Sequence, residues 1–388
     1  MYDRDLGPAV LTMATQYPVV TIMGPRQSGK TTLVKALFPE KPYVNLEAPD
    51  IRGLAIADPR AFLNQFPNGV ILDEIQRAPE LLSYIQPIVD ETQEQGRYIL
   101  TGSHQLQLHA AIAQSLAGRT ALLNLYPLTI SELTKAEFNL TLDEQLYHGF
   151  YPRIYQQGLN PTQAYRDYYS TYVERDVRQL IHLKDVTLFE KFMRLCAGRI
   201  GSLLDLTSLG NDVGVSSHTI THWLSILEAS YLIVRLQPFF NNKSKRLIKS
   251  PKLYFTDVGL ACYLLHIEEP KQLARDPLRG FLFENMVIME LMKARYNANK
   301  KPNLYFYRDH HQNEVDALLV SGDKYTAIEI KSAETFTPEF VKGLQRLYTT
   351  SPEQWMAGYV VYAGAYEQAI HPFHLIHYKQ AAQVLKQG

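Results

Sequence analysis

The amino-acid sequence predicts an α/β fold that begins with a parallel β-sheet flanked by helices. The first observation is an alternation of strand and helix patterns, with short apolar runs near residues 19–23, 43–46, 70–73, 98–102 and 121–125. Such an alternation is typical of βαβ units. The second observation is a glycine-containing loop directly after the first strand. The third is a pair of carboxylates at the end of the third strand.

The loop after the first strand matches the pattern G-x-x-x-x-G-K-[ST] at residues 24–31. Its glycines let successive backbone N–H groups turn toward phosphate oxygens. Lys30 is expected to reach the β- and γ-phosphates of a nucleoside triphosphate, and the Thr31 hydroxyl to hold Mg²⁺. A glycine-rich turn without a ligand is the alternative, but the strand before the loop and the helix after it favour phosphate binding. The predicted cofactors are ATP and Mg²⁺, and the residues expected to cradle ATP are Gly24, Pro25, Arg26, Gln27, Ser28, Gly29, Lys30, Thr31 and Thr32.

The acid pair Asp73 and Glu74 follows the apolar strand at residues 69–72, which is the Walker B form. Asp73 is expected near Mg²⁺, directly or through water. Glu74 is placed to polarise the water that attacks the γ-phosphate. A solvated strand end would explain the same two residues, but the phosphate loop upstream favours the catalytic interpretation. Because an attacking water needs its own base, the second acid indicates hydrolysis rather than phosphoryl transfer to a small molecule.

The strand near 98–102 ends in small polar residues, where additional-strand NTPases carry a sensor of the γ-phosphate. Ser103 or Thr101 is the candidate sensor, with His104 assisting, although an N-cap at Ser103 accounts for the same residues. Arg119 is a candidate arginine finger or sensor for charge in the transition state. An ordinary surface arginine remains the alternative for that position.

Composition limits the remaining possibilities. A chain of 388 residues predicts two or three domains. Lys plus Arg equals Asp plus Glu at 39 each, so any nucleic-acid surface must be a local patch. Cys196 and Cys262 are predicted to be packed thiols. The absence of a signal-like or membrane-spanning apolar run predicts a cytoplasmic protein without a membrane partner.

The middle of the chain contains a predicted helix at residues 165–180 and, over about 186–240, the pattern of a winged helix. The charges of the first helix are expected to face the nucleotide, a neighbouring subunit or solvent. The winged helix is expected either to bind nucleic acid or to pack against another domain. A basic patch follows, which fits phosphate contact or a solvated hairpin tip equally well; it comprises Lys243, Lys245, Arg246, Lys249 and Lys252.

The C-terminal part carries a second candidate site. Asp316 lies on one predicted strand, and Glu329 and Lys331 lie two residues apart on the same face of the next. This is the Asp…Glu-x-Lys layout of restriction-endonuclease-like folds, in which carboxylates hold Mg²⁺ and the lysine orients the attacking water. Glu284 lies on the preceding helix, where such folds often add an acid. Charged alternation on a hairpin is the alternative, so cleavage stays open.

Taken together, these segments resemble the prokaryotic AAA-type ATPases that carry a C-terminal domain of unknown function with a nuclease-like fold. The resemblance implies an ATP-binding domain at 1–135, a helical and winged-helix domain at 136–245, and a nuclease-like α/β domain at 246–388. It also implies a homo-oligomer in which an arginine acts in trans. His104 departs from the serine that is usual there. The matching segments are residues 24–31, 72–76, 100–103, 118–119, 126–133, 172–176, 251–259, 280–284, 314–316 and 329–331.

Two functions follow from the sequence. The first is an Mg²⁺-dependent ATPase that couples its nucleotide state to nucleic-acid binding by the C-terminal domains. The second is an ATP-controlled signalling or assembly switch that binds a protein partner and uses an inactive nuclease-like fold as a scaffold. A small-molecule kinase is disfavoured by the acid pair at Asp73 and Glu74 and by the large C-terminal half.

Overall fold

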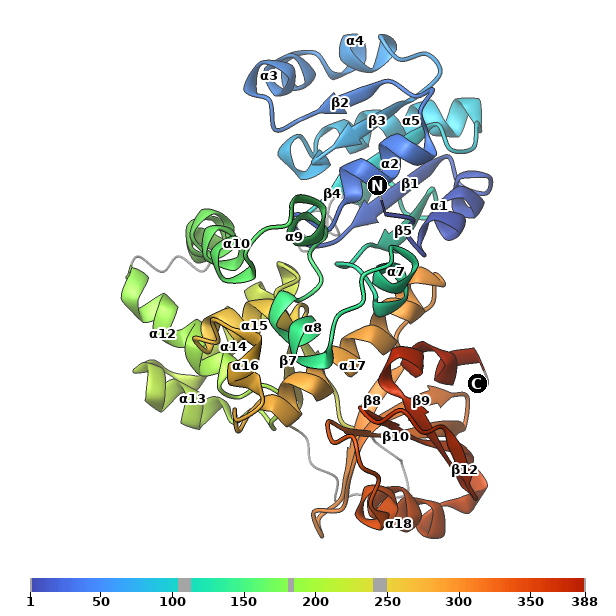
Figure 1. Cartoon of the computed structure of the whole chain (residues 1–388). Coiled ribbons are helices and arrows are strands. Elements are labelled where there is room, and N and C mark those ends of the chain that lie inside the picture. Colours follow the sequence, from blue (N-terminus) through green and yellow to red (C-terminus); the bar gives the residue numbers. More distant parts are fainter. Residues whose placement is uncertain (1, 104–111, 113, 181–184, 240–249, 387–388) are drawn as a thin grey trace.

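The computed structural model describes residues 2–103, 112, 114–180, 185–239 and 250–386, which form three packed units (Figure 1). The N-terminal unit is built on a parallel sheet in the order β2-β3-β4-β1-β5. All five predicted strands are present, and β4 lies between β1 and β3, as the additional-strand prediction requires. The strands are β1 (Val19–Met23), β2 (Tyr43–Asn45), β3 (Val70–Asp73), β4 (Tyr98–Gly102) and β5 (Thr120–Asn124).

Helices cover both faces of this sheet (Figure 1). The strands β1, β3 and β4 are buried along their whole length, which explains their continuous apolar sequences. The helices of this unit are α1 (Gly7–Ala14), α2 (Lys30–Leu37), α3 (Pro49–Ala57), α4 (Pro59–Asn64), η1 (Ile75–Arg77), α5 (Leu81–Thr92) and α7 (Ile130–Lys135).

A run of helices leads from the N-terminal unit into the middle of the chain. The predicted helix at 165–180 is present as a continuous α10, η2 and α11, and its Tyr165, Tyr168, Tyr169 and Tyr172 are buried. Tyrosine packing therefore occupies one face of this helix; the side chains of Arg175 and Asp176 lie outside the described residues. The elements are α8 (Leu142–His148), α9 (Pro152–Gln157), α10 (Pro161–Tyr168), the π-helix η2 (Tyr169–Val177) and α11 (Arg178–Leu180).

The middle unit continues with three helices and a two-stranded sheet. Gly214, at φ 98°, ends the second of these helices, and Ser216 caps the third by accepting a hydrogen bond from the N–H of Thr219. The elements are α12 (Val186–Ala197), α13 (Leu206–Val213), α14 (Ser217–Ala229), β6 (Ile233–Leu236), β7 (Lys252–Phe255), α15 (Val258–Leu264) and α16 (Pro270–Leu273).

The predicted boundary between residues 245 and 246 falls between two strands that pair with each other. Strand β6 is antiparallel to β7, and α15 packs against α8, α10 and α12. The structure therefore places residues up to α16 in the middle unit, because backbone pairing holds β7 there. Four residues of the predicted basic patch, Lys243, Lys245, Arg246 and Lys249, lie outside the described residues, and only Lys252 can be placed.

The C-terminal unit is a long helix followed by a mixed sheet of order β12-β13-β11-β10-β9-β8. Strands β9 and β10 form the predicted hairpin around Gly322, and β10 pairs in parallel with β11. The elements are α17 (Arg279–Asn297), β8 (Leu304–Arg308), β9 (Glu314–Ser321), β10 (Lys324–Lys331), η3 (Pro338–Val341), α18 (Lys342–Thr350), η4 (Pro352–Gln354), β11 (Trp355–Tyr362), β12 (Gln368–Ile370), β13 (Phe373–His377) and η5 (Tyr378–Lys386).

Helix α17 joins all three units. It contacts β10 and η5 of the C-terminal unit, α8 and α15 of the middle unit, and β5 of the N-terminal unit. In Figure 1 it runs from the middle helices toward α7. One hydrophobic cluster extends from Val19 in β1 to Val384 in η5. Both cysteines are buried thiols without a disulfide, as predicted. Within the described residues, no helix combines the length and apolar character needed to cross a membrane.

Candidate functional site

The phosphate loop connects β1 to α2, and glycine occupies two of its sterically restricted positions. Gly24 has φ 152°, and a Cβ atom there would lie 2.0 Å from the carbonyl oxygen of Leu125. Gly29 has φ 94° and immediately precedes α2. The first glycine therefore lets the loop pass against the end of β5, and the second lets the chain turn into the helix.

Lys30 lies inside the turn of this loop. Its side chain is buried, and Nζ donates hydrogen bonds of 2.9 and 2.8 Å to the carbonyl oxygens of Gly24 and Pro25. Burial lowers the pKa of Lys30, while the charges of Glu74 and Asp73 act in the opposite direction. The buried Ser28 hydroxyl has no hydrogen-bond partner among the described residues. An anion in the loop would therefore meet an ammonium group and a spare hydroxyl donor.

Asp73 is held beside Thr31 at the end of β3. The Thr31 hydroxyl donates a 2.9 Å hydrogen bond to Oδ2 of Asp73, and the Tyr43 hydroxyl donates one of 2.7 Å to the same oxygen. Thr101 donates to Oδ1 of Asp73. Mg²⁺ in nucleotide sites takes only one or two protein ligands and completes its shell with phosphate and water. The Thr31 hydroxyl and the Asp73 carboxylate fit such an ion.

Glu74 is the next residue and adopts a left-handed backbone, with φ 57° and ψ 48°. Its Oε2 accepts a 2.8 Å hydrogen bond from the Ser103 hydroxyl and another from Nε2 of Gln76. Gln76 also donates a 3.1 Å hydrogen bond to Oγ of Ser103. Burial alone would raise the pKa of Glu74, but the Lys30 charge and these two donors lower it below its ordinary value. Glu74 is thereby kept as a carboxylate.

The structure thus brings together residues that follow three strands at one edge of the sheet; these are Lys30 and Thr31 after β1, Asp73 and Glu74 at the end of β3, and Ser103 after β4. The two hydroxyl residues considered as sensors have separate contacts, since Thr101 bonds Asp73 and Ser103 bonds Glu74. His104 lies outside the described residues. The sequence reasoning assigned no role to Gln76, although its position two residues after Glu74 was a local signal.

The side chain of Arg4 anchors the phosphate loop, and no pattern in the sequence indicated this contact. It is 6% exposed; Nη1 and Nη2 donate 2.6 Å hydrogen bonds to the carbonyl oxygens of Ser28 and Tyr126. Its Nε pairs with Glu132 at 3.0 Å. One guanidinium therefore ties the loop to the segment after β5. These partners lie 24, 122 and 128 residues away, so no sequence pattern links them.

Arg119 lies at the opposite end of the sheet. It directly precedes β5, whereas the phosphate loop follows the end of β1, its parallel neighbour. Five strand residues at about 3.3 Å each separate these two ends by roughly 15 Å. The guanidinium is paired with Asp90 through Nε at 2.5 Å and Nη2 at 2.8 Å. Arg119 is therefore not brought to the nucleotide site of its own chain.

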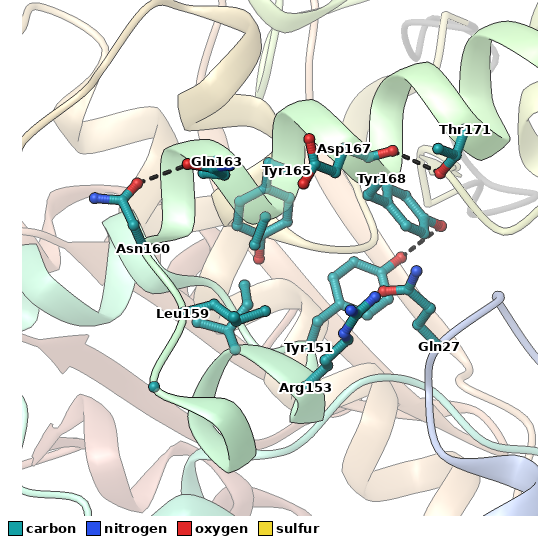
Figure 2. Close-up of a pocket in the computed structure, with 13 residues that line it drawn as sticks. Gln27, Tyr151, Arg153, Leu159, Asn160, Gln163, Tyr165, Asp167, Tyr168 and Thr171 are labelled. Atoms are coloured by element: carbon teal, nitrogen blue, oxygen red, sulfur yellow. Dashed lines mark hydrogen bonds between the residues drawn. The ribbon is translucent and has the colours of Figure 1, made fainter.

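A cavity of about 380 Å³ opens beside the phosphate loop, between α9 and α10 (Figure 2). Gln27 of the loop borders it, and the rings of Tyr151 and Tyr168 lie next to Gln27 in this view. The two tyrosines are linked by a 2.9 Å hydrogen bond between their hydroxyl groups. Aromatic faces and amide side chains thus line one continuous space next to the loop. The other lining residues are Arg153, Ile154, Gly158, Leu159, Asn160, Gln163, Ala164, Tyr165, Asp167 and Thr171.

The second candidate site lies on the β9–β10 hairpin. Nζ of Lys331 is 3.0 Å from Oε1 of Glu329 and 3.5 Å from Oδ2 of Asp316. The backbone N–H of Ile330 donates a 2.7 Å hydrogen bond to Asp316. Burial, together with the charge of Asp316, raises the pKa of Glu329 to about 8. The three residues expected from the sequence are therefore adjacent in a largely buried, acidic cluster.

Glu284 of α17 faces the same cluster but has partners of its own. Its Oε1 accepts hydrogen bonds from Lys252 at 2.9 Å and from the Tyr254 hydroxyl at 2.5 Å. Burial and Asp316 raise the pKa of Glu284 to about 7. In the described part of the chain, no group of three or more His, Cys, Asp or Glu residues is arranged to hold a metal ion.

Comparison with known proteins divides the chain into three matches. Residues 16–134 match the AAA domain family, residues 139–271 a domain of unknown function (DUF8612), and residues 279–380 another domain of unknown function (DUF4143). The second match spans the boundary predicted at residue 245. The N-terminal unit is therefore similar to AAA domains over residues 16–134, and its parallel sheet around the phosphate loop agrees with that similarity.

Whole-chain relatives have no described activity. Uncharacterized proteins of Mycobacterium bovis and Mycobacterium tuberculosis are each 29% identical over 345 residues, which cover 88% of this chain and 76% of theirs. Among solved structures, a Walker-type ATPase of Pyrococcus abyssi aligns with 68% of this chain and 96% of its own, at 15% identity and a TM-score of 0.48.

Proposed function

We propose that the chain binds ATP with Mg²⁺, hydrolyses it, and couples its nucleotide state to nucleic-acid binding by the middle and C-terminal units. The observation that carries the hydrolytic part is the placement of Glu74 beside Lys30 and Asp73, with its carboxylate held ionised. A base near the γ-phosphate is what hydrolysis requires and what simple nucleotide binding does not.

Each residue of the site has a distinct role in this proposal. The loop N–H groups, Lys30 and Ser28 bind the β- and γ-phosphates. Thr31 and Asp73 would hold Mg²⁺, which neutralises phosphate charge when bound. Glu74 accepts a proton from the attacking water. Ser103 orients Glu74 through its hydrogen bond and is placed to report on the γ-phosphate.

The cavity beside the loop is the proposed place for the base and ribose of ATP. Gln27 belongs both to the loop and to the cavity wall, so the cavity adjoins the loop (Figure 2). Tyr151 and Tyr168 offer aromatic surface for a planar base, and Asn160 and Gln163 offer amide groups for its edge.

Contacts between units support the coupling. Arg4 bonds both Ser28 of the loop and the carbonyl of Tyr126. The ring of Tyr126 stacks on Tyr296 of α17, with centroids 5.1 Å apart. Lys293 of α17 donates a 2.8 Å hydrogen bond to the carbonyl of Leu128. These contacts form an unbroken physical connection from the phosphate loop to α17.

The nucleic-acid part rests on the middle unit, which we interpret as a winged helix. Helices α13 and α14 are joined by a glycine turn, and β6 and β7 form an antiparallel pair behind them. Ser217, His218, Thr221 and His222 are exposed on one face of α14. Polar side chains at this spacing on the second helix of a helix-turn-helix are suited to a groove.

The alternative is an ATP-controlled switch that binds a protein partner. One observation favours it. In the cluster formed by Glu284, Asp316, Glu329 and Lys331, the acid on α17 is already ion-paired with Lys252. Under this alternative the C-terminal unit keeps the α/β order of a nuclease but serves as a scaffold.

The test is ATP turnover by the wild type and by Glu74→Gln, with and without single-stranded and duplex DNA, over a salt series. Glu74→Gln should bind ATP but hydrolyse it poorly. DNA that stimulates the wild type with strong salt dependence supports the first function and eliminates the switch as the main role. Turnover that persists in Lys30→Ala would disprove hydrolysis at the phosphate loop.

A further inference from the structure

Lys252 is a buried lysine of the middle unit whose side chain reaches into the acidic cluster of the C-terminal unit. This cluster is called the centre below. It is 2% exposed and stands at the start of β7, whose pairing with β6 fixes it in the middle unit. Its Nζ lies 2.9 Å from Oε1 of Glu284 on α17 and 2.6 Å from Oε1 of Glu314 on β9. One ammonium group therefore bridges two carboxylates of the C-terminal unit.

Strand β7 reinforces this bridge with a second donor. Tyr254 lies two residues after Lys252, on the same face of the strand, and its hydroxyl donates to the same oxygen of Glu284. Burial would lower the pKa of Lys252, but the charges of Glu284, Asp316 and Glu314 raise it. Lys252 is therefore kept as a cation among the acids.

The remaining acids of the centre are only partly matched by positive charge. Lys331 contacts Asp316 and Glu329, and Arg308 contacts the other oxygen of Glu314 at 3.0 Å. Oε2 of Glu329 is buried and has no hydrogen-bond partner among the described residues. Buried carboxylates require a compensating charge or a proton, so a centre that lost the ammonium of Lys252 would take up another cation or a proton in its place.

We propose that Lys252 is the built-in cation of this centre. Its ammonium group occupies the position on Glu284 and Glu314 that a divalent cation would otherwise take, so the intact chain holds a lysine there. The centre accepts a divalent metal ion only when the lysine is removed. This inference rests on the nuclease-like assignment of the C-terminal unit but not on ATP hydrolysis.

The charges of this centre come from two units. Because β7 is one strand of the β6–β7 sheet, the cation is carried by the middle unit while the carboxylates are carried by α17 and the C-terminal sheet. The ion pairs are thus a contact between the two units.

The test measures Mn²⁺ binding to the full chain in the absence of nucleotide, with electron paramagnetic resonance as the detection method. Lys252→Met removes the charge and keeps the length of the side chain. It should gain one Mn²⁺ site per chain, bound at least tenfold more tightly than any site of the wild type, and adding Asp316→Asn should abolish the gain. Tyr254→Phe is the matched control, because it removes the other donor to Glu284 while leaving the ammonium; it should gain no site. Thr31→Val is added to each of these chains in order to remove Mn²⁺ binding at the phosphate loop.

Two outcomes would overturn the inference. One is a wild-type chain that already binds Mn²⁺ at a site sensitive to Asp316→Asn, a result that needs no Lys252 variant to fold. The other is a folded Lys252→Met chain that binds no more Mn²⁺ than the wild type. ATP turnover is measured on the same samples. A chain that does not hydrolyse ATP would refute the proposed ATPase, but Mn²⁺ binding by the wild type and by Lys252→Met would still test the role of Lys252.

Discussion

The Ser103 hydroxyl donates a 2.8 Å hydrogen bond to Oε2 of Glu74, joining the ends of the neighbouring strands β4 and β3. The insertion of β4 between β1 and β3 creates this contact, because it places the residue after β4 next to the acid after β3. The base proposed for hydrolysis is thus oriented by the additional strand and not by its own.

Replacing Ser103 with alanine is expected to shift the pH dependence of ATP turnover. Hydrolysis needs Glu74 ionised, and the Ser103 hydrogen bond helps to hold the pKa of Glu74 down. Its loss should move the acid limb of kcat to higher pH, because the ionised form of Glu74 loses one of the hydrogen bonds that stabilise it. KM for ATP should change little. Ser115→Ala, which removes a buried serine that hydrogen bonds the Ser83 hydroxyl, is the control. If the acid limb of kcat does not shift in Ser103→Ala, the proposed effect of Ser103 on the pKa of Glu74 is contradicted.

Replacing Arg4 with alanine is expected to weaken both stability and ATP binding. The change leaves Glu132 buried without its ion-pair partner and leaves two carbonyls unbonded, which costs about 3–5 kcal/mol. Urea unfolding measures the first effect, and KM for ATP, which should rise, measures the second.

The matched control for Arg4→Ala is the double variant with Glu132→Gln, which removes the orphaned charge. The double variant should recover part of the stability but not the KM, because Ser28 still lacks its anchor. A recovery of both would show that Arg4 acts on the fold alone.

Replacing Arg119 with alanine should leave ATP turnover unchanged wherever the chain is monomeric, because Arg119 lies at the far end of the sheet. Turnover is measured over a protein concentration series alongside sedimentation. Asp90→Ala breaks the same ion pair and serves as the control. A loss that is specific to Arg119→Ala and grows with self-association would establish an arginine acting in trans; a loss in the monomer would contradict the placement.

Stability is expected to depend on pH through Glu290 of α17. This buried acid accepts a 3.0 Å hydrogen bond from the N–H of Ile130, and burial raises its pKa from 4.5 to about 7. The folded state therefore binds more protons than the unfolded state between these values. The contribution of Glu290 to stability is fully present below pH 4.5 and is lost as the pH rises through about 7, on the order of 1–3 kcal/mol.

The check is chemical unfolding between pH 5 and 8 for the wild type and Glu290→Gln, which keeps the acceptor oxygen but cannot ionise. The wild type should lose stability across this range and the variant should show a flatter profile. Parallel profiles would mean that Glu290 does not titrate in the folded protein.

Much of the N-terminal unit was predictable because its signals are local. The strands β1, β3 and β4 are short apolar runs buried along their whole length. The phosphate loop is a continuous eight-residue pattern whose glycines meet steric limits that the backbone imposes. The hairpin that carries Asp316, Glu329 and Lys331 was visible for the same reason, since alternation along a strand places residues on one face.

By itself, the sequence determined the parallel sheet of the N-terminal unit, its phosphate loop and its acid pair, because these features arise from neighbouring residues. Only the tertiary structure decided what surrounds them. It brought Arg4 into hydrogen-bond contact with the phosphate loop and Ser103 into contact with Glu74. It paired Arg119 with Asp90 away from the nucleotide site, and it paired Lys252 of β7 with Glu284. These contacts join residues that lie tens of positions or more apart, and strand order and helix packing, which no local pattern encodes, bring them together.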